Sequence, residues 1–263
     1  MQRCPTHNRL IQKRRLFHDS FYFDHCVRNL LSDRIHSDFS GGMDDRKALA
    51  LRAGHQLPAD CPVALKVIAW LAGTRLTVIG EEHIPKDTPV LYISNHRSYF
   101  DIILTYARCP RPTGYVAKKE MLKIPLLSRW MKFLHCQFLD RSDLRAGLKM
   151  ILSCVDLIKN GVSITIFPEG TRGKGSNELE MLPFHEGSFK VATKSGCPII
   201  PIAISGSSAI FEDHKPYVRR RDVTIEYGAP IYPAQLSKED QKALGKYTQG
   251  VIEEMLRGQL QNG

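Results

Sequence analysis

The chain has 263 residues, of which 43% are hydrophobic and 24% are charged, a composition that supports one large domain with a sizeable core. Its 37 Lys and Arg residues exceed its 27 Asp and Glu residues by 10, which favours an anionic partner: nucleic acid, a lipid surface or a phosphorylated substrate. The longest apolar run, residues 62–73, contains Lys66 and would extend only about 18 Å as a helix, so we expect no segment that crosses a bilayer.

The seven cysteines form no C-x-x-C pair and no cluster with His at zinc-ligand spacing. An odd, scattered set of this kind is typical of reduced thiols in a cytosolic compartment. We interpret them as core or incidental residues, and we expect no metal site.

Residues 1–42 show neither helical nor strand periodicity. They contain a basic cluster at residues 12–15 and a break at residues 40–42. We interpret this segment as a mobile arm or as an extension upstream of a start at Met43, and contact of the basic cluster with anionic lipid is the alternative. The sequence therefore divides into an N-terminal basic arm, residues 1–61, and a folded domain, residues 62–263.

From residue 62 onward, helical and strand patterns alternate along the chain. The predicted helices are residues 63–71, 126–134, 142–159, 187–194 and a last one capped by Ser237; the predicted strands are residues 75–79, 89–94, 115–117, 137–139, 163–167, 199–205 and 223–227. The helix at 142–159 is amphipathic, and the last helix carries Leu244, Tyr247, Val251, Met255 and Leu256 on one face. Such alternation predicts an α/β fold with a mainly parallel central sheet and helices on both faces.

One recurrent pattern, His-x-x-x-x-Asp, could let a carboxylate orient an imidazole. It begins at His55, His96 and His135; with ten His and fifteen Asp in the chain, chance alone predicts roughly half a match, so the bare pattern is weak evidence. Only His96 directly follows an apolar strand, in the polar loop where open parallel sheets bind ligands. We therefore take His96 and Asp101 as the functional pair.

A second polar block leaves the carboxyl end of the predicted strand at 163–167. Gly170 permits unusual backbone angles, and Thr171 and Arg172 are donors suited to a phosphate. A Walker phosphate loop is rejected because its first Gly would fall at Pro168 and neither Ser nor Thr follows Lys174.

Together these blocks resemble the phospholipid and glycerol-phosphate acyltransferase family, in particular its bacterial 1-acylglycerol-3-phosphate acyltransferases. Four blocks occur in the family order within residues 75–232. They are residues 95–101; 116–121 with 124–125 and 138–141; 167–172; and 198–202. The chain departs from the family at Ser128, where Gly is usual, and at His185, where Lys is usual. The resemblance implies a glycerol-phosphate acyltransferase-like fold and an acyltransferase domain over residues 62–263.

The resemblance implies acyl transfer from acyl-CoA or acyl carrier protein to the sn-2 hydroxyl of lysophosphatidic acid, giving phosphatidic acid in phospholipid biosynthesis. His96 would act as general base and Asp101 would orient it, in one direct step without metal or cofactor. The expected substrate-binding residues are Lys118 and the N–H of Gly170 for the oxyanion, Arg141 and Arg172 for the phosphate, Glu169 for a glycerol hydroxyl, and Asn95 and Thr171.

Lipid substrates imply peripheral attachment to an anionic membrane surface, at its cytoplasmic face. Trp70 and Trp130 lie on two short apolar helices, and residues 125–134 mix apolar and basic side chains as interfacial helices do; ordinary core helices are the alternative. Other acceptors remain open: glycerol 3-phosphate, another lysophospholipid or an acylated amino-acid lipid. A basic lipid- or nucleic-acid-binding protein without catalysis is suggested by residues 219–221, but no aromatic interleaving accompanies them, so we expect no nucleic acid.

Overall fold

The computed structural model describes residues 60–174 and 177–262. Apart from its last two residues, the predicted N-terminal arm lies outside this part of the chain, and so does His55.

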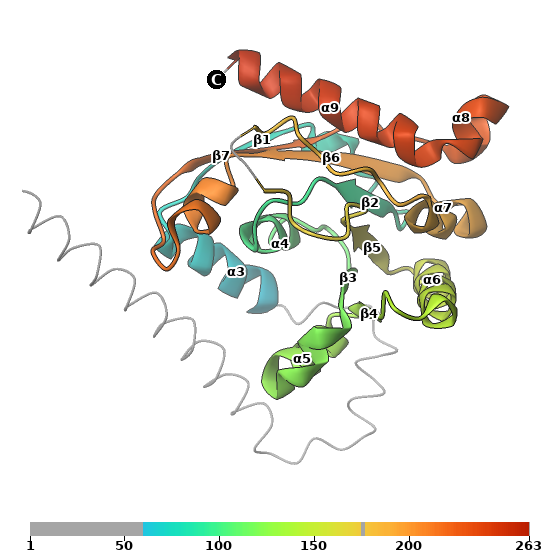
Figure 1. The fold of residues 1–263 in the computed structure, drawn as a ribbon, viewed down its shortest axis with the longest axis horizontal. Helices are drawn as coiled ribbons and strands as arrows, with labels where there is room; N and C mark the ends of the chain where they lie inside the picture. The colour runs from blue at the N-terminus through green and yellow to red at the C-terminus, as the bar shows by residue number, and fades with distance from the viewer. Residues whose placement is uncertain (1–59, 175–176, 263) are drawn as a thin grey trace, which may run out of the picture.

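Within the described residues, seven strands form one sheet in the order β1-β7-β6-β2-β5-β3-β4 (Figure 1). The strands are β1 (Arg75–Ile79), β2 (Leu91–Ser94), β3 (Thr113–Lys118), β4 (Gln137–Leu139), β5 (Ser163–Ile166), β6 (Ile199–Ser205) and β7 (Asp222–Tyr227). All neighbours pair in parallel except β6 and β7, which are antiparallel. The predicted mainly parallel sheet is confirmed.

Helices cover both faces of this sheet (Figure 1). They are α3 (Asp60–Leu71), α4 (Phe100–Tyr106), α5 (Pro125–Phe133), α6 (Leu144–Lys159), α7 (Lys190–Ser195), α8 (Lys238–Lys242) and α9 (Leu244–Asn262). Alternate residues of β2 enter different cores, because successive strand side chains point to opposite faces. Leu91 and Ile93 pack with α6, α7 and α9, whereas Tyr92 packs with α4. Burial on both faces explains why β2 reads as a continuous apolar run.

Two helical features differ from the sequence prediction. The predicted last helix is two helices: Ser237 caps α8 by accepting from the N–H of Asp240, and α9 begins separately at Leu244. Helix α4 was not predicted, because its seven residues are too few to display a helical period.

Helix α6 buries only part of its apolar surface. Asp143 caps its start and Gly161 follows its end with a φ of +86°. Its C-terminal half is buried against the sheet, whereas Leu144, Leu148 and Leu152 are 91%, 51% and 46% exposed. These three leucines lie one helical turn apart and are called the leucine stripe below.

The two tryptophans differ in their surroundings. Trp130 of α5 packs against a buried cluster that includes Tyr115 and Leu134, whereas Trp70 of α3 is 75% exposed. Neither the interfacial nor the core interpretation therefore applies to both helices. In the part of the chain that the structure covers, no helix combines the length and the apolar character needed to span a membrane.

Candidate active site

The candidate site residues follow four neighbouring parallel strands at their carboxyl ends. Residues 95–101 follow β2, residues 167–173 follow β5, Lys118 ends β3, and Arg141 lies two residues beyond β4. Because these strands are adjacent in the order β2-β5-β3-β4, their carboxyl ends meet at one edge of the sheet. This is the edge at which open α/β sheets bind ligands.

His96 and Asp101 are joined as the sequence predicted. The Nδ1 atom of His96 lies 2.9 Å from Oδ2 of Asp101, which also accepts the backbone N–H groups of Arg97 at 2.7 Å and Ser98 at 2.8 Å. Since Oδ2 is the acceptor in all three bonds, Nδ1 donates, and Nε2 is left with its lone pair as the basic nitrogen. The geometry can therefore present a general base.

The surroundings of His96 hold the imidazole at the molecular surface. Its ring stacks on Phe167, with ring centroids 4.1 Å apart, and its side chain is 14% exposed while that of Asp101 is fully buried. Phe167 directly follows β5, so the imidazole lies between the loops after two adjacent strands. The site is therefore partly enclosed but reachable.

Glu169 ties the two loops together through backbone contacts. Its Oε1 accepts the N–H of His96 at 2.8 Å, and its Oε2 accepts the N–H of Leu182 at 2.9 Å. The carbonyl of His96 in turn accepts the N–H of Gly173 at 2.7 Å. Burial raises the pKa of Glu169, and the two backbone N–H groups oppose that shift. Glu169 thus connects the His96 loop to the backbone at Leu182, and its expected contact to a glycerol hydroxyl stays a prediction.

Asn95 also has a different role from the expected substrate contact. Its fully buried amide donates to the carbonyl of Ile204 at 2.8 Å and accepts the N–H of Ile204 at 2.9 Å. Both amide atoms are therefore bonded to the backbone of β6. Asn95 anchors the end of β2 next to the catalytic candidate.

The turn at Gly170 brings a cation toward the site. Gly170 has a φ of +72°, and the guanidinium carbon of Arg141 lies 3.2 Å from the position that a Cβ would occupy. Only glycine fits there without displacing Arg141. However, the N–H of Gly170 donates to the carbonyl of Phe167 at 3.0 Å, so it is not available to an oxyanion, contrary to expectation.

Two other predicted substrate-binding residues, Lys118 and Thr171, have exposed side chains.

The loop that carries Arg141 is braced by Asp140. This carboxylate accepts from Lys119 Nζ at 2.7 Å and from the N–H and hydroxyl of Ser142 at 3.0 and 2.6 Å. These bonds, chiefly the one from Lys119, lower the pKa of Asp140 to about 2. The exposed guanidinium of Arg141 therefore extends from an ordered turn.

Arg172 has partners that sequence analysis missed. Its Nη1 lies 2.8 Å from Oε1 of Glu212, its Nη2 lies 3.3 Å from the hydroxyl of Tyr99, and its guanidinium carbon lies 3.9 Å from the centre of the Tyr99 ring. Glu212 is 40 residues away in the chain and belongs to no recognised motif, so no local signal could have identified it.

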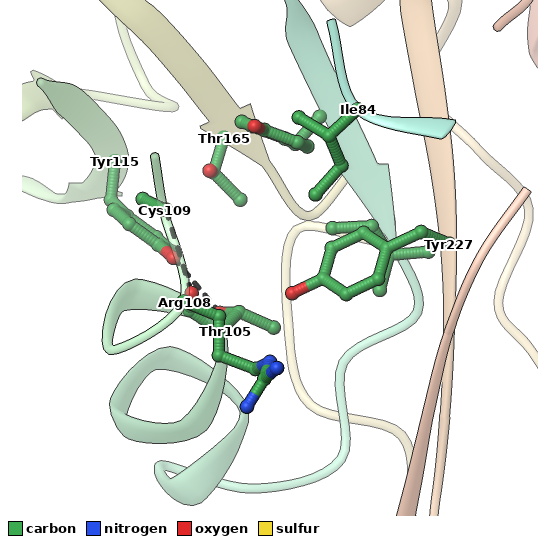
Figure 2. Close-up of a pocket in the computed structure, with 9 residues that line it drawn as sticks. Ile84, Thr105, Arg108, Cys109, Tyr115, Thr165 and Tyr227 are labelled. Carbon is green, nitrogen blue, oxygen red and sulfur yellow. Dashed lines mark hydrogen bonds between the residues drawn. The ribbon is translucent and has the colours of Figure 1, made fainter. Parts of the chain in front are cut away.

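A separate hollow lies between α4 and the sheet, where side chains of Ile84, Thr105, Arg108, Cys109, Tyr115, Thr165 and Tyr227 converge (Figure 2). Thr105 and Tyr115 bond each other there at 2.8 Å, Arg108 bonds Glu81 outside the hollow, and no candidate site residue lines it. Burial raises the pKa of Cys109 and of Cys136 to about 11 and that of Cys154 to about 12. Thiols that stay protonated at neutral pH are poor nucleophiles, which favours His96 as the reactive centre.

Known proteins with similar sequences show which family the chain resembles. Residues 75–205 match the family model described as Acyltransferase. The 1-acyl-sn-glycerol-3-phosphate acyltransferases of Cocos nucifera and Saccharomyces cerevisiae are 32% and 30% identical over 167 and 191 residues, which are 63% and 72% of this chain and 53% and 61% of theirs. That of Borreliella burgdorferi is 31% identical over 147 residues, 56% of this chain and 58% of its own. The chain thus spans a little over half the length of these relatives.

A solved structure has the same fold. The crystal structure of the 1-acyl-sn-glycerophosphate (LPA) acyltransferase PlsC from Thermotoga maritima aligns with a TM-score of 0.73 and 25% identity, covering 94% of this chain and 96% of that one. The family match, the shared fold and the order of the four sequence blocks lead to one conclusion: the chain belongs to the acyltransferase family.

Proposed function

We propose that this protein transfers a fatty acyl group from acyl-CoA or acyl carrier protein to the sn-2 hydroxyl of lysophosphatidic acid, giving phosphatidic acid. The observation that carries the proposal is the position of His96. Its imidazole is bonded to Asp101, and its backbone is bonded to the turn that leads to Arg172. A general base and a cationic phosphate site therefore share one edge of the sheet. The names of the relatives support the choice of acceptor.

In the proposed reaction, Nε2 of His96 removes the proton of the acceptor hydroxyl as its oxygen attacks the thioester carbonyl. Asp101 accepts from Nδ1 and stabilises the imidazolium that forms. An ester C–O bond forms, the thioester C–S bond breaks, and the imidazolium returns the proton to the departing thiolate. Because the attacking oxygen belongs to the acceptor, no acyl-enzyme intermediate is required.

The proposed phosphate grip consists of Arg141 and Arg172, since guanidinium groups bind phosphate oxygens in a bidentate manner. Arg141 is exposed beside Gly170, and Arg172 keeps 30% of its side chain exposed while it bonds Glu212. For the oxyanion we propose Lys118, which ends the strand beside β5 with an exposed side chain. Thr171 is proposed as an additional donor to the acceptor.

We also propose that the protein attaches peripherally to an anionic membrane through the leucine stripe of α6. The stripe starts three residues after Arg141, and exposed Arg145 and Lys149 lie between its leucines. Apolar side chains interleaved with basic ones are typical of helices that lie in the lipid interface, and each basic residue near anionic lipid contributes about 1 kcal/mol. Cys109, Cys136, Cys154 and Cys197 are free thiols, which supports the cytoplasmic face.

The test of the proposed activity is a panel of acceptors offered to the purified protein with one labelled acyl-CoA. The panel contains lysophosphatidic acid, glycerol 3-phosphate, lysophosphatidylglycerol, lysophosphatidylcholine, an acylated amino acid and monoacylglycerol. We expect the highest kcat/KM with lysophosphatidic acid and little transfer to monoacylglycerol, which lacks the phosphate. A higher value for another acceptor would reassign the substrate. Failure with every acceptor, with acyl-CoA and also with acylated acyl carrier protein as donor, would refute the activity.

A further inference from the structure

Glu212 connects the two halves of the candidate site. It lies in a short 3-10 turn, Glu212–His214, that follows β6. Its Oε1 accepts from Arg172 Nη1 at 2.8 Å and from the N–H of Tyr99 at 3.0 Å, and its Oε2 accepts the hydroxyl of Ser98 at 2.5 Å. One carboxylate therefore holds both Arg172, the proposed phosphate-binding residue, and the loop that carries His96 and Asp101.

The burial of this pair shows which end faces the solvent. The side chain of Glu212 is 11% exposed, whereas that of Arg172 is 30% exposed, so the carboxylate lies on the protein side of the guanidinium. Arg172 uses Nη1 for Glu212 and Nη2 for Tyr99, and a guanidinium has five N–H donors in total. Within the described residues the other donors of Arg172 have no partner, so they are available to a phosphate.

Arg172 binds a phosphate more tightly when other residues already hold its side chain in the binding orientation. A free arginine side chain loses about 2 kcal/mol of rotamer entropy when it is fixed, and a guanidinium that is already oriented avoids much of this cost. The Tyr99 ring beneath the guanidinium and the carboxylate beside it fix its plane from two directions.

We propose that Glu212 is a positioning residue that sets the specificity for a phosphate-bearing acceptor. It orients Arg172 toward the acceptor phosphate. Through its bonds to Ser98 and Tyr99, it also fixes the position of the His96 loop relative to that phosphate. This inference rests on the proposed function and adds a residue outside the four sequence blocks. The opposite role, a carboxylate that competes with phosphate for Arg172, makes the contrary prediction for acceptor affinity.

The experiment compares Glu212→Ala and Glu212→Gln with wild type, with Asp213→Asn as matched control. Asp213 lies on the same turn but is exposed and bonds Ser208, away from Arg172. Initial rates give KM for acyl-CoA and for a short-chain, water-soluble lysophosphatidic acid, and calorimetry gives the Kd of that acceptor. We expect Glu212→Ala to raise the acceptor KM and Kd about tenfold, Glu212→Gln about threefold, and the donor KM less than about twofold, the size of one charge-assisted hydrogen bond.

A double-mutant cycle then tests whether Glu212 acts through Arg172. In the Arg172→Ala background, Glu212→Ala should change the acceptor KM by less than about twofold, because the residue that it orients is gone, while its effect on kcat through Ser98 persists. Multiplicative effects on acceptor KM, an equal rise in donor KM, an effect of Asp213→Asn on acceptor KM equal to that of Glu212→Ala, or tighter acceptor binding in either Glu212 variant would overturn the inference.

Failure of this inference is distinguishable from failure of the proposed function. A wild-type protein that neither binds nor acylates lysophosphatidic acid would refute both. An active wild type whose Glu212 variants show any of the contrary results refutes the role of Glu212 alone. Should Glu212→Ala prove unfolded by circular dichroism, the nearly isosteric Glu212→Gln carries the same cycle.

Discussion

The imidazole of His96 is held from three directions by residues of different kinds. Asp101 bonds its Nδ1, Phe167 stacks on its ring, and the carboxylate of Glu169 accepts from its backbone N–H. These contacts fix the tautomer, the plane and the position of the ring before any substrate binds. A base that is already oriented avoids reorganisation during the reaction.

Replacing His96 by Ala should reduce kcat at least about a hundredfold, because no other group would accept the proton from the acceptor hydroxyl. Circular dichroism should show an unchanged fold, since the partly exposed imidazole lies in a loop beyond the end of β2. Turnover close to that of wild type would exclude His96 as the base. Asp101→Asn should also lower kcat, since the amide oxygen can take the place of Oδ2 but carries no negative charge to stabilise the imidazolium that forms.

The change Glu169→Gln tests the bridge between the two loops. One of the two backbone N–H groups, of His96 or of Leu182, would then face the amide NH₂ instead of an acceptor. An unsatisfied buried donor costs about 1–3 kcal/mol, so urea unfolding should show a loss of that size, together with a lower kcat. Glu180→Gln is the control, because the Glu180 carboxylate is exposed. Equal stability of the two variants would contradict a bridging role.

At the scale of elements, the site is built from loops that follow parallel strands, and α6 forms part of the surface next to it. The N-terminal turns of α6 follow Arg141 in the chain and present the leucine stripe outward. Three exposed leucines on one helix are costly in water unless a partner covers them. A lipid surface suits both these side chains and the basic residues between them.

Replacing Leu148 by Glu should weaken binding to vesicles of mixed phosphatidylglycerol and phosphatidylcholine about fivefold or more, since it puts a negative charge into an apolar and anionic interface. Co-sedimentation measures the binding, and activity on a water-soluble short-chain acceptor should stay unchanged. The matched control is Leu260→Glu on α9, where the leucine is 50% exposed, close to the 51% of Leu148. Equal loss in both variants would argue against the stripe, and a raised KM for acyl carrier protein alone would point to a protein partner.

At the scale of the whole molecule, the central strands are linked by bonds between residues far apart in the chain. Asn95 bonds both backbone polar groups of Ile204, which lies 109 residues later, and so joins the end of β2 to β6. The catalytic candidate is the next residue. The position of His96 is therefore coupled to the stability of the sheet.

Asn95→Ala should lower the free energy of unfolding by about 2–4 kcal/mol, because the buried N–H and carbonyl of Ile204 would lose their partners. Urea unfolding measures this loss. Asn160→Ala is the control: Asn160 also donates its amide to a backbone carbonyl, that of Asp156, but at the exposed end of α6, so the change should cost less than about 1 kcal/mol. Similar losses in the two variants would show that Asn95 is not a structural link.

Much of the fold was predictable because its signals are local. The strands at residues 75–79, 137–139 and 199–205 match their predicted bounds, since a short apolar or alternating run suffices to indicate a strand. The His96–Asp101 contact was also predictable, because both residues lie on one loop five positions apart. The antiparallel direction of β7 was not, because pairing direction depends on the path of the chain and not on composition.

What the sequence by itself determined is thus the alternation of helices and strands and the contact between His96 and Asp101, the proposed general-base pair. Only the tertiary structure decided that Glu169 and Asn95 bond backbone groups, that Glu212 holds Arg172, and that the leucine stripe faces outward. These three sets of contacts and the orientation of the leucine stripe have one physical reason in common. A polar side chain takes the partner that the fold brings within about 3 Å, and an apolar one is buried only where another element covers it.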